Sequence, residues 1–179
     1  MATRRLSLPV KLLSCLLLSP LLASCGGYPQ VVKLPFSQQG EGVNTAASEF
    51  HPEMAQRYVA FVSDRNGSQD IYLYDQRDRE LISLPGLNAL DEMASNPAVS
   101  ENGQLIAFTK QGQGQSDIYL YNRETRAVRN LTSNLSAQVR HPTISADGST
   151  IAFEANPDGN WDILVYDRSG NPLDLPGMQ

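Results

Sequence analysis

The strongest constraint on the fold is a segment that occurs three times between residues 51 and 177. An Ala-Phe pair begins at positions 60, 107 and 152, which lie 47 and 45 residues apart. An Asp-Ile pair follows at 70, 117 and 162, and a proline precedes at 52, 97 and 142. A period in the mid-forties, with several short strands per copy, is typical of the blades of a β-propeller.

Turn signals divide each copy into strands. Asn96–Ser100 and His141–Ser145 are expected to form short inner strands, each followed by a tight Asn-Gly or Asp-Gly turn. The next strand, such as Leu105–Phe108, is apolar throughout, as expected where neighbouring sheets cover both faces. An alternating third strand and a weaker outer strand complete the copy. The sequence therefore predicts an all-β fold with three propeller blades of four antiparallel strands over residues 51–179, which is a partial propeller.

This pattern resembles the repeat of the TolB-like propeller family (WD40-like PD40 repeats). The third copy carries the motif of that family at Pro142, Ser145, Asp147-Gly148, Ile151–Phe153, Gly159 and Asp162-Ile163. The second copy has Asn102 in place of the turn aspartate, and the first matches only from its second strand onward. The resemblance implies a propeller and, by analogy, a role in the integrity of the cell envelope. The chain departs from TolB in having three blades rather than six and no room for the N-terminal α/β domain of TolB.

Three blades pose a physical problem, because propellers normally close with four to eight. The outer faces of the first and third blades would stay uncovered, and exposed ends of repeat arrays need caps. Two chains could form a six-bladed ring, a partner could cover the open ends, or three blades could persist as an arc. The sequence leaves these three solutions open.

The first 24 residues are expected to be a lipoprotein signal peptide. Arg4, Arg5 and Lys11 accompany an apolar run of about a dozen residues, which is shorter than the roughly 20 that a membrane-spanning helix needs. The run ends in Leu22–Cys25, which resembles the lipobox of bacterial lipoproteins, where the thiol is acylated and the chain is cut just before it. We therefore expect lipid on Cys25 and a flexible tether over residues 25–50.

The expected location is the bacterial cell envelope, with the protein anchored to a membrane and facing the periplasm. Gly26 stands where an aspartate would retain a lipoprotein in the inner membrane, so the outer membrane is favoured. Cleavage would leave 11 basic and 19 acidic side chains, a net charge of −8, which argues against nucleic-acid binding. The same cut would remove Cys15, so no disulfide is expected.

Two sets of residues suggest chemistry but fit structural roles better. His51 and His141 each precede the opening proline of a copy, where the middle copy has Asn96. They could form a metal pair, but a polar start to an inner strand is favoured. Polar residues are phased at two repeat positions, with Asp70, Asp117 and Asp162 at one and Asp75, Asn122 and Asp167 at the other. They recur once per blade, which favours shaping turns over acid–base work or Ca²⁺ binding. We expect no catalytic residue, metal or cofactor. The alternative is a polysaccharide lyase or hydrolase whose site forms when the chain dimerises.

Residues outside the repeat indicate a binding rim. Trp161, the one tryptophan, replaces Gln69 and Ser116 at the same repeat position. Loops expected on the same rim add Asp91, Glu92 and Arg140. An aromatic side chain beside charges is typical of a protein- or glycan-binding surface, although Trp161 could equally pack against a blade edge. The sequence thus predicts a non-catalytic, lipid-anchored envelope protein whose propeller binds a protein or cell-wall partner.

Overall fold

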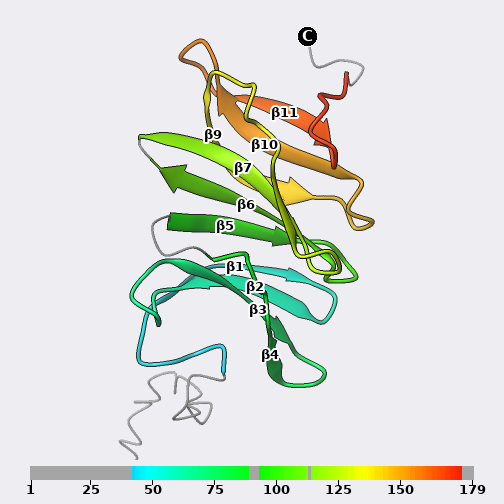
Figure 1. Ribbon diagram of the computed structural model, residues 1–179. Coiled ribbons are helices and arrows are strands. Elements are labelled where there is room, and N and C mark those ends of the chain that lie inside the picture. The colour runs from blue at the N-terminus through cyan, green and yellow to red at the C-terminus, as the bar shows by residue number, and fades with distance from the viewer. Residues whose placement is uncertain (1–41, 89–92, 113, 175–179) are drawn as a thin grey trace, which may run out of the picture. The chain divides into compact units, whose positions relative to one another are not determined.

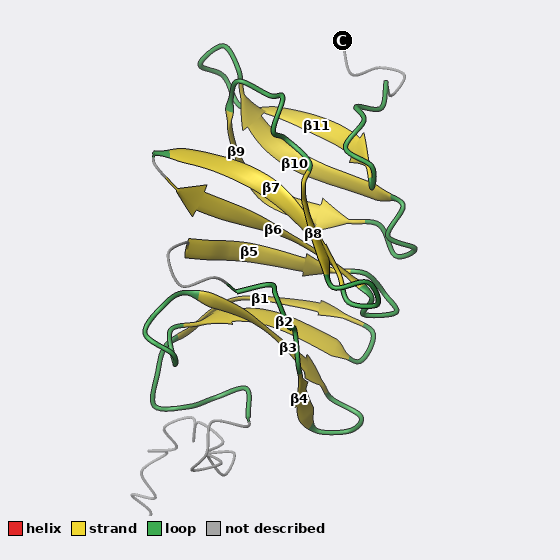
Figure 2. Ribbon diagram, viewed as in Figure 1, coloured by secondary structure: helices red, strands yellow, loops and turns green. Residues whose placement is uncertain are grey.

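The computed structural model describes residues 42–88, 93–112 and 114–174, which form eleven strands and no helix (Figure 2). The described residues therefore include no helix that could cross a membrane. By its contacts the chain divides into Met1–Lys33 and Leu34–Gln179, and all described residues belong to the second unit. The predicted signal peptide and Cys25 lie outside the described residues.

Three antiparallel sheets follow one another along the chain, one for each sequence copy (Figure 1). Blade 1 contains β1 (Glu49–Ala55), β2 (Tyr58–Ser63), β3 (Asp70–Asp75) and β4 (Glu80–Ile82). Blade 2 contains β5 (Met93–Val99), β6 (Leu105–Gly112), β7 (Gln115–Asn122) and β8 (Ala127–Asn130). Blade 3 contains β9 (Gln138–Ile144), β10 (Thr150–Asn156) and β11 (Asp162–Asp167). Within each blade, every strand pairs with the next along the chain, which confirms the predicted propeller blades.

Two blade boundaries differ from the expected ones. β1 begins at Glu49, inside the segment expected to be a tether, because Glu49 pairs with Ser63 of β2. Blade 3 has three strands and only the start of a fourth, where Pro172 forms a single bridge to Tyr166. Pro172 cannot donate a backbone hydrogen bond, which suits the first residue of an edge strand.

The core lies between the sheets. Alternate side chains of β6 point to opposite neighbours, so Ile106 and Phe108 pack toward blade 1 while Leu105 and Ala107 pack toward blade 3. We call the face of a blade toward the preceding blade its front and the face toward the following blade its back. Both faces of the middle blade are thus buried, as its continuous apolar strand predicted.

The sequence Ser-x-Asp-Gly in blade 3, and Ser-x-Asn-Gly in blade 2, builds the turn between the first two strands of the blade. In blade 3, Asp147 accepts hydrogen bonds from the Ser145 hydroxyl at 2.7 Å and from the Ser149 backbone N–H at 3.0 Å. Bonds from Ser145 and Ser149 lower the pKa of Asp147 to about 2. Gly148 has a φ of 72°, and a Cβ there would lie 2.5 Å from Leu105 of blade 2. The turn therefore requires glycine for its conformation and for close packing between blades.

The substitution Phe108→Ala tests whether the core lies between the blades. The Phe108 ring is 1% exposed and stacks on Tyr119 with centroids 5.8 Å apart. Phe108→Ala is expected to lower the free energy of unfolding by about 3–5 kcal/mol, since it removes a buried ring and leaves a cavity. Urea denaturation of the mature, lipid-free chain measures this loss. Val128→Ala, on the exposed outer strand of the same blade, is the matched control, and equal losses in the two variants would contradict the packing described.

Candidate protein-binding surface

Trp161 and Arg140 lie together at one edge of blade 3. Trp161 stands in the loop just before β11, and the Arg140 guanidinium lies 3.8 Å from the centroid of its ring. Trp161 is 42% exposed, so one face of the indole is covered by Arg140 while part of the ring remains open to solvent. A cation over an aromatic ring is an attractive contact that fixes both side chains. The structure therefore brings these two predicted rim residues together.

The sequence predicted Arg140 in a loop between blades. In the structure it lies on β9 instead. The strand begins earlier because Val139 is buried and both of its backbone groups are bonded to Ser116 of blade 2. The Ser116 hydroxyl donates to the Val139 carbonyl at 2.7 Å and accepts from its N–H at 2.9 Å. These bonds extend β9 by pinning it to blade 2, and they place Arg140 on the sheet rather than on a loop.

Glu154 of β10 links the cluster electrostatically. Arg140 pairs with Glu154 across the two strands, and its Nε lies 2.6 Å from the Glu154 Oε2 atom. The His141 Nδ1 atom lies 3.2 Å from the other carboxylate oxygen. The hydrogen bond from Arg140, followed by the one from His141, lowers the pKa of Glu154. Blades 1 and 2 have Val62 and Thr109 at this position, so the charged cluster is specific to blade 3.

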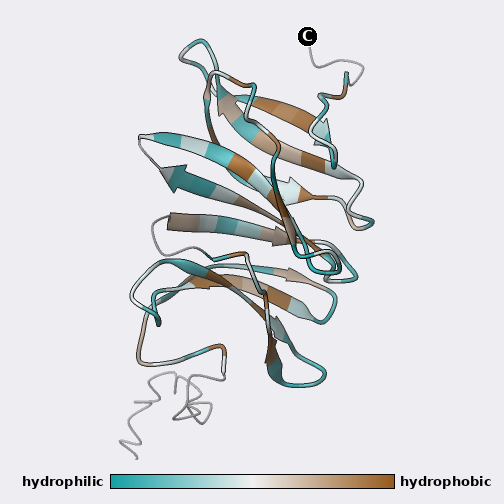
Figure 3. Cartoon of the chain, in the orientation of Figure 1, coloured by the Kyte–Doolittle hydropathy of each residue, from teal (hydrophilic) through white to brown (hydrophobic). Residues whose placement is uncertain are grey.

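Apolar side chains continue the same back face of blade 3. Ile163 pairs with Glu154 and is 51% exposed, whereas the equivalent Ile71 and Ile118 are 1% and 0% exposed. Val165 is half-buried, and the hydropathy colouring shows that most of β11 is apolar (Figure 3). No following blade covers these positions among the described residues. We call Arg140, Glu154, Trp161, Ile163 and Val165 the blade-3 patch.

The front of blade 1 is better covered than the back of blade 3. Phe61 points away from blade 2 yet is 1% exposed, because it stacks on Tyr72 and the Arg65 guanidinium lies 5.4 Å from its ring. Arg65 donates to the carbonyls of Gly42 and Val43 at 3.0 and 2.9 Å. This arginine, held by the backbone before β1, therefore shields part of a sheet face that no other described blade covers.

Two of the expected rim residues, Asp91 and Glu92, lie outside the described residues. The histidines, by contrast, are placed clearly. His51, Asn96 and His141 have φ values of 48°, 48° and 50°, and each is an extra residue at a bulge in the inner strand. Histidine and asparagine are the side chains that tolerate this left-handed conformation best after glycine. Their repetition in all three blades is thus explained by the backbone.

The residues phased once per blade have structural partners. At the first repeat position, Asp70 accepts a hydrogen bond from the Ser68 hydroxyl at 3.0 Å and Asp117 accepts one from the Thr132 hydroxyl at 2.8 Å. The second repeat position has backbone partners. Asp75 accepts a backbone hydrogen bond from Arg77 at 2.9 Å, and Asn122 accepts one from Glu124 at the same distance. Asp167 repeats this with the N–H of Ser169 at 2.8 Å. Asp75, Asn122 and Asp167 thus each close the turn that follows the third strand of their blade, as favoured from the sequence. Among the described residues, no three His, Cys, Asp or Glu side chains converge as a metal site would require.

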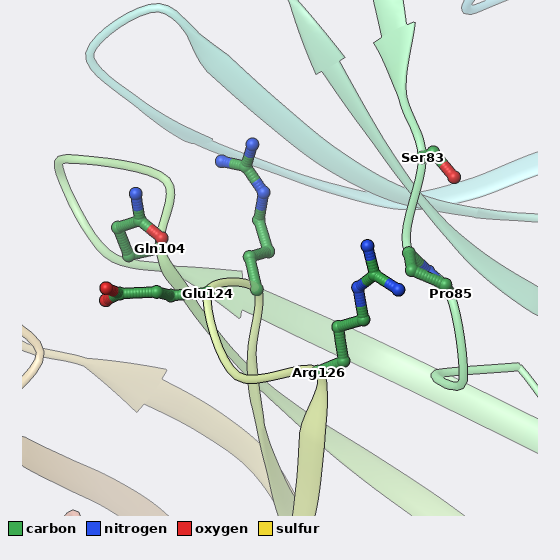
Figure 4. Close-up of a pocket in the computed structure, with 6 residues that line it drawn as sticks. Ser83, Pro85, Gln104, Glu124 and Arg126 are labelled. Atoms are coloured by element: carbon green, nitrogen blue, oxygen red, sulfur yellow. The ribbon is translucent and has the colours of Figure 1, made fainter.

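A surface pocket between blades 1 and 2 was not expected from the sequence (Figure 4). It has a volume of about 450 Å³ and is lined by Ser83, Pro85, Gln104, Arg123, Glu124 and Arg126. Figure 4 shows Arg126 directed toward the loop that carries Pro85. Arg123 is already bound to the Gly103 carbonyl at 2.6 Å. The sequence did contain one signal for this pocket, because Arg123 and Arg126 lie three residues apart in a single turn.

Solved structures resemble the chain in fold. TolB from Acinetobacter baumannii matches with a TM-score of 0.55 and 23% identity, over 74% of this chain and 33% of that one. The putative TolB from Agrobacterium tumefaciens matches with 0.56 and 17%, over 72% and 48%. The β-propeller domain of the Trilobed protease from Pyrococcus furiosus, which has an open velcro topology, matches with 0.55 and 16%, over 72% and 42%. The fold is that of TolB-like propeller blades.

The chain spans a third to a half of the length of these structures. No protein-family model matches it, and no curated protein matches its sequence. The structural likeness thus supports the predicted blades and their TolB-like character, and it comes from TolB and from the propellers of peptidases alike.

Arg140→Gln tests the electrostatics of the blade-3 patch. Loss of the cation is expected to raise the pKa of Glu154 toward its ordinary value of 4.5. Because a carboxyl with a lowered pKa stabilises the fold above its ordinary pKa and loses that effect as the pH falls, the variant should show a weaker acid dependence of stability. Carbon NMR titration of Glu154 measures the pKa directly.

Trp161 gives a second readout of the same substitution. Without the guanidinium over its ring, its fluorescence should be quenched more strongly by acrylamide. Arg129→Gln is the control, because Arg129 lies on the exposed outer strand β8 and has no contact with the patch. An unchanged Glu154 titration in Arg140→Gln would contradict the ion pair.

Proposed function

We propose that this chain is a non-catalytic, lipid-anchored protein of the bacterial cell envelope that binds a protein partner through the blade-3 patch. The observation that carries the proposal is the exposure of Ile163 at a position buried in both other blades. A sheet face with exposed apolar side chains beside an aromatic ring and charges has the composition of a protein interface, with an apolar centre and a polar rim. In this chain the same face of blades 1 and 2 is covered by another sheet.

Lipid anchoring is supported by the residues before the blades. The apolar run and the Leu22–Cys25 sequence together supply an export signal and an acylation site. Gly26 favours delivery to the outer membrane on the periplasmic side. The likeness to TolB adds a link to envelope proteins through the family resemblance, because the blades are shared.

A non-catalytic role is supported by what the polar residues of the blades already do. Asp75 and Asp167 close turns, and the two histidines occupy strained bulges in blades 1 and 3. Glu154, the one carboxylate on the open face of blade 3 that is specific to this blade, is neutralised by Arg140. These groups are engaged in structure rather than held ready for proton transfer.

Cys25→Ala tests the anchor. The variant is expected to leave the membrane fraction and to lose incorporation of an alkyne-tagged palmitate, because acyl chains supply about 0.8 kcal/mol of membrane binding per buried methylene. Cell fractionation and in-gel fluorescence measure the two effects. Cys15→Ala is the matched control and should behave like the natural chain. Persistent labelling of the Cys25 variant would show that the anchoring proposal is wrong.

Photo-crosslinking tests the binding surface in the full-length protein. A benzophenone amino acid at position 163 is expected to form a covalent adduct with another protein chain in intact cells, because this side chain would lie inside the interface. The control carries the same probe at position 128, an exposed apolar site on the outer strand of blade 2. Adducts are detected by immunoblotting and identified by mass spectrometry. A blank result at 163, with the protein present at normal levels, would refute the proposed use of the patch.

A further inference from the structure

The two terminal faces of the chain are made from the same repeat positions as its internal interfaces. Inside the chain, the back of one blade packs on the front of the next. The front of blade 1 carries Val59, Phe61, Tyr72 and Tyr74 where the front of blade 2 carries Ile106, Phe108, Tyr119 and Tyr121. The back of blade 3 carries Ala152, Ile163 and Val165 where the back of blade 2 carries Ala107, Ile118 and Leu120. The terminal faces therefore repeat the positions that form the two sides of each internal interface.

Both terminal faces are incompletely covered. On the front of blade 1, Met54 is 64% exposed and its neighbours Val59 and Tyr74 are half-buried. The residues equivalent to those neighbours in blade 2, Ile106 and Tyr121, are both 0% exposed because blade 1 covers them. Another sheet on this face would bury the same positions.

Arg65, which shields part of the front of blade 1, does not prevent such packing. It lies 4.4 Å from the centroid of the Tyr72 ring. In blade 2 the Lys110 ammonium lies 4.9 Å from the centroid of Tyr119, the equivalent tyrosine, inside the interface with blade 1. A cation above this ring is thus compatible with a blade stacked over it.

The charges of the blade-3 patch also fit an interface. Glu154 is bound by Arg140 and His141, so a partner would cover a neutralised group rather than a lone charge. The internal interface already has a polar group at this position, because the buried Thr109 hydroxyl faces blade 3. Trp161 and Arg140 would then lie at the rim beside the apolar centre formed by Ile163 and Val165.

The match between the two faces selects the occupant. A second copy of this chain offers the front of its blade 1 to the back of blade 3. The three described blades of two copies make six, which lies within the four to eight blades typical of closed propellers. We propose that a second copy of this chain seats on the blade-3 patch, with the back of blade 3 of one copy against the front of blade 1 of the other, twice, to close a six-bladed ring. The inference rests on the proposed function of the patch, because it names the partner bound there.

The test uses two full-length copies with different affinity tags, co-expressed and purified in detergent through one tag. Natural copies should co-purify, and native mass spectrometry should count two chains per particle. Ile163→Asp places a charge on the back of blade 3, and Met54→Asp places one on the front of blade 1. Either substitution in both copies should reduce co-purification by about tenfold or more. Met93→Asp is the control, because Met93 is 51% exposed like Ile163 but lies at the start of β5.

Pairing the two variants tests the head-to-tail arrangement. When one copy carries Ile163→Asp and the other Met54→Asp, one of the two interfaces is natural on both sides. Co-purification should therefore recover above the level of either variant with itself, which also shows that both variants fold. A back-to-back dimer would instead respond to Ile163→Asp and ignore Met54→Asp, and that outcome overturns the inference.

The crosslinking experiment separates this inference from the proposed function. Adducts from position 163 to a second copy support both. Adducts only to a different protein, with no co-purification of tagged copies, overturn the ring and leave the proposed function standing. If neither adducts nor co-purification are seen, both the six-bladed ring and the proposed function are overturned.

Discussion

Packing of one apolar sheet face on another is the interaction on which the rest of this structure depends. The buried strand of blade 2 places Ile106 and Phe108 in one interface and Leu105 and Ala107 in the other, so the middle blade has no side available for solvent. Sheets of this kind are stable only in a stack, because each blade buries its apolar surface against its neighbours. The same requirement leaves the three described blades with two faces that none of them covers.

The chain treats those two faces differently. On the front of blade 1, Arg65 lies over Phe61 and is held there by the Gly42 carbonyl, and the ring also stacks on Tyr72. The phenylalanine that fills an internal interface in blade 2 is therefore buried locally in blade 1. On the back of blade 3, the repeat position held by Val62 and Thr109 becomes Glu154, and Arg140 and His141 neutralise it. Charges on an exposed sheet face oppose non-specific aggregation, and here they leave Ile163 accessible.

The periodicity of the sequence was sufficient to predict the blades, the order of their strands and the double burial of Leu105–Phe108, because spacing alone determines which side chains share a face. The contact of Arg140 with Trp161 was not predictable in detail. It depends on the bulge at His141, which inserts one residue into β9, and a shift of one residue moves a side chain to the other face of a sheet. A signal for the bulge was present, since His51, Asn96 and His141 are side chains that tolerate positive φ before a proline. The early start of β9 depends on Ser116, which is distant in sequence, so no local pattern could reveal it.

A head-to-tail contact between copies can lead to open-ended growth, and the geometry of the repeats determines whether it does. A heterologous interface either closes into a ring or continues as a filament, depending on the rotation between successive units. Within this chain the rotation is set by packing that tolerates little change, as at Gly148, where a Cβ would meet Leu105 of the neighbouring blade at 2.5 Å. If the interface between copies repeats the internal ones, it also repeats their rotation, and growth stops when the blades meet. The tight turns that hold each blade to the next would therefore determine the size of the assembly as well as the stability of the single chain.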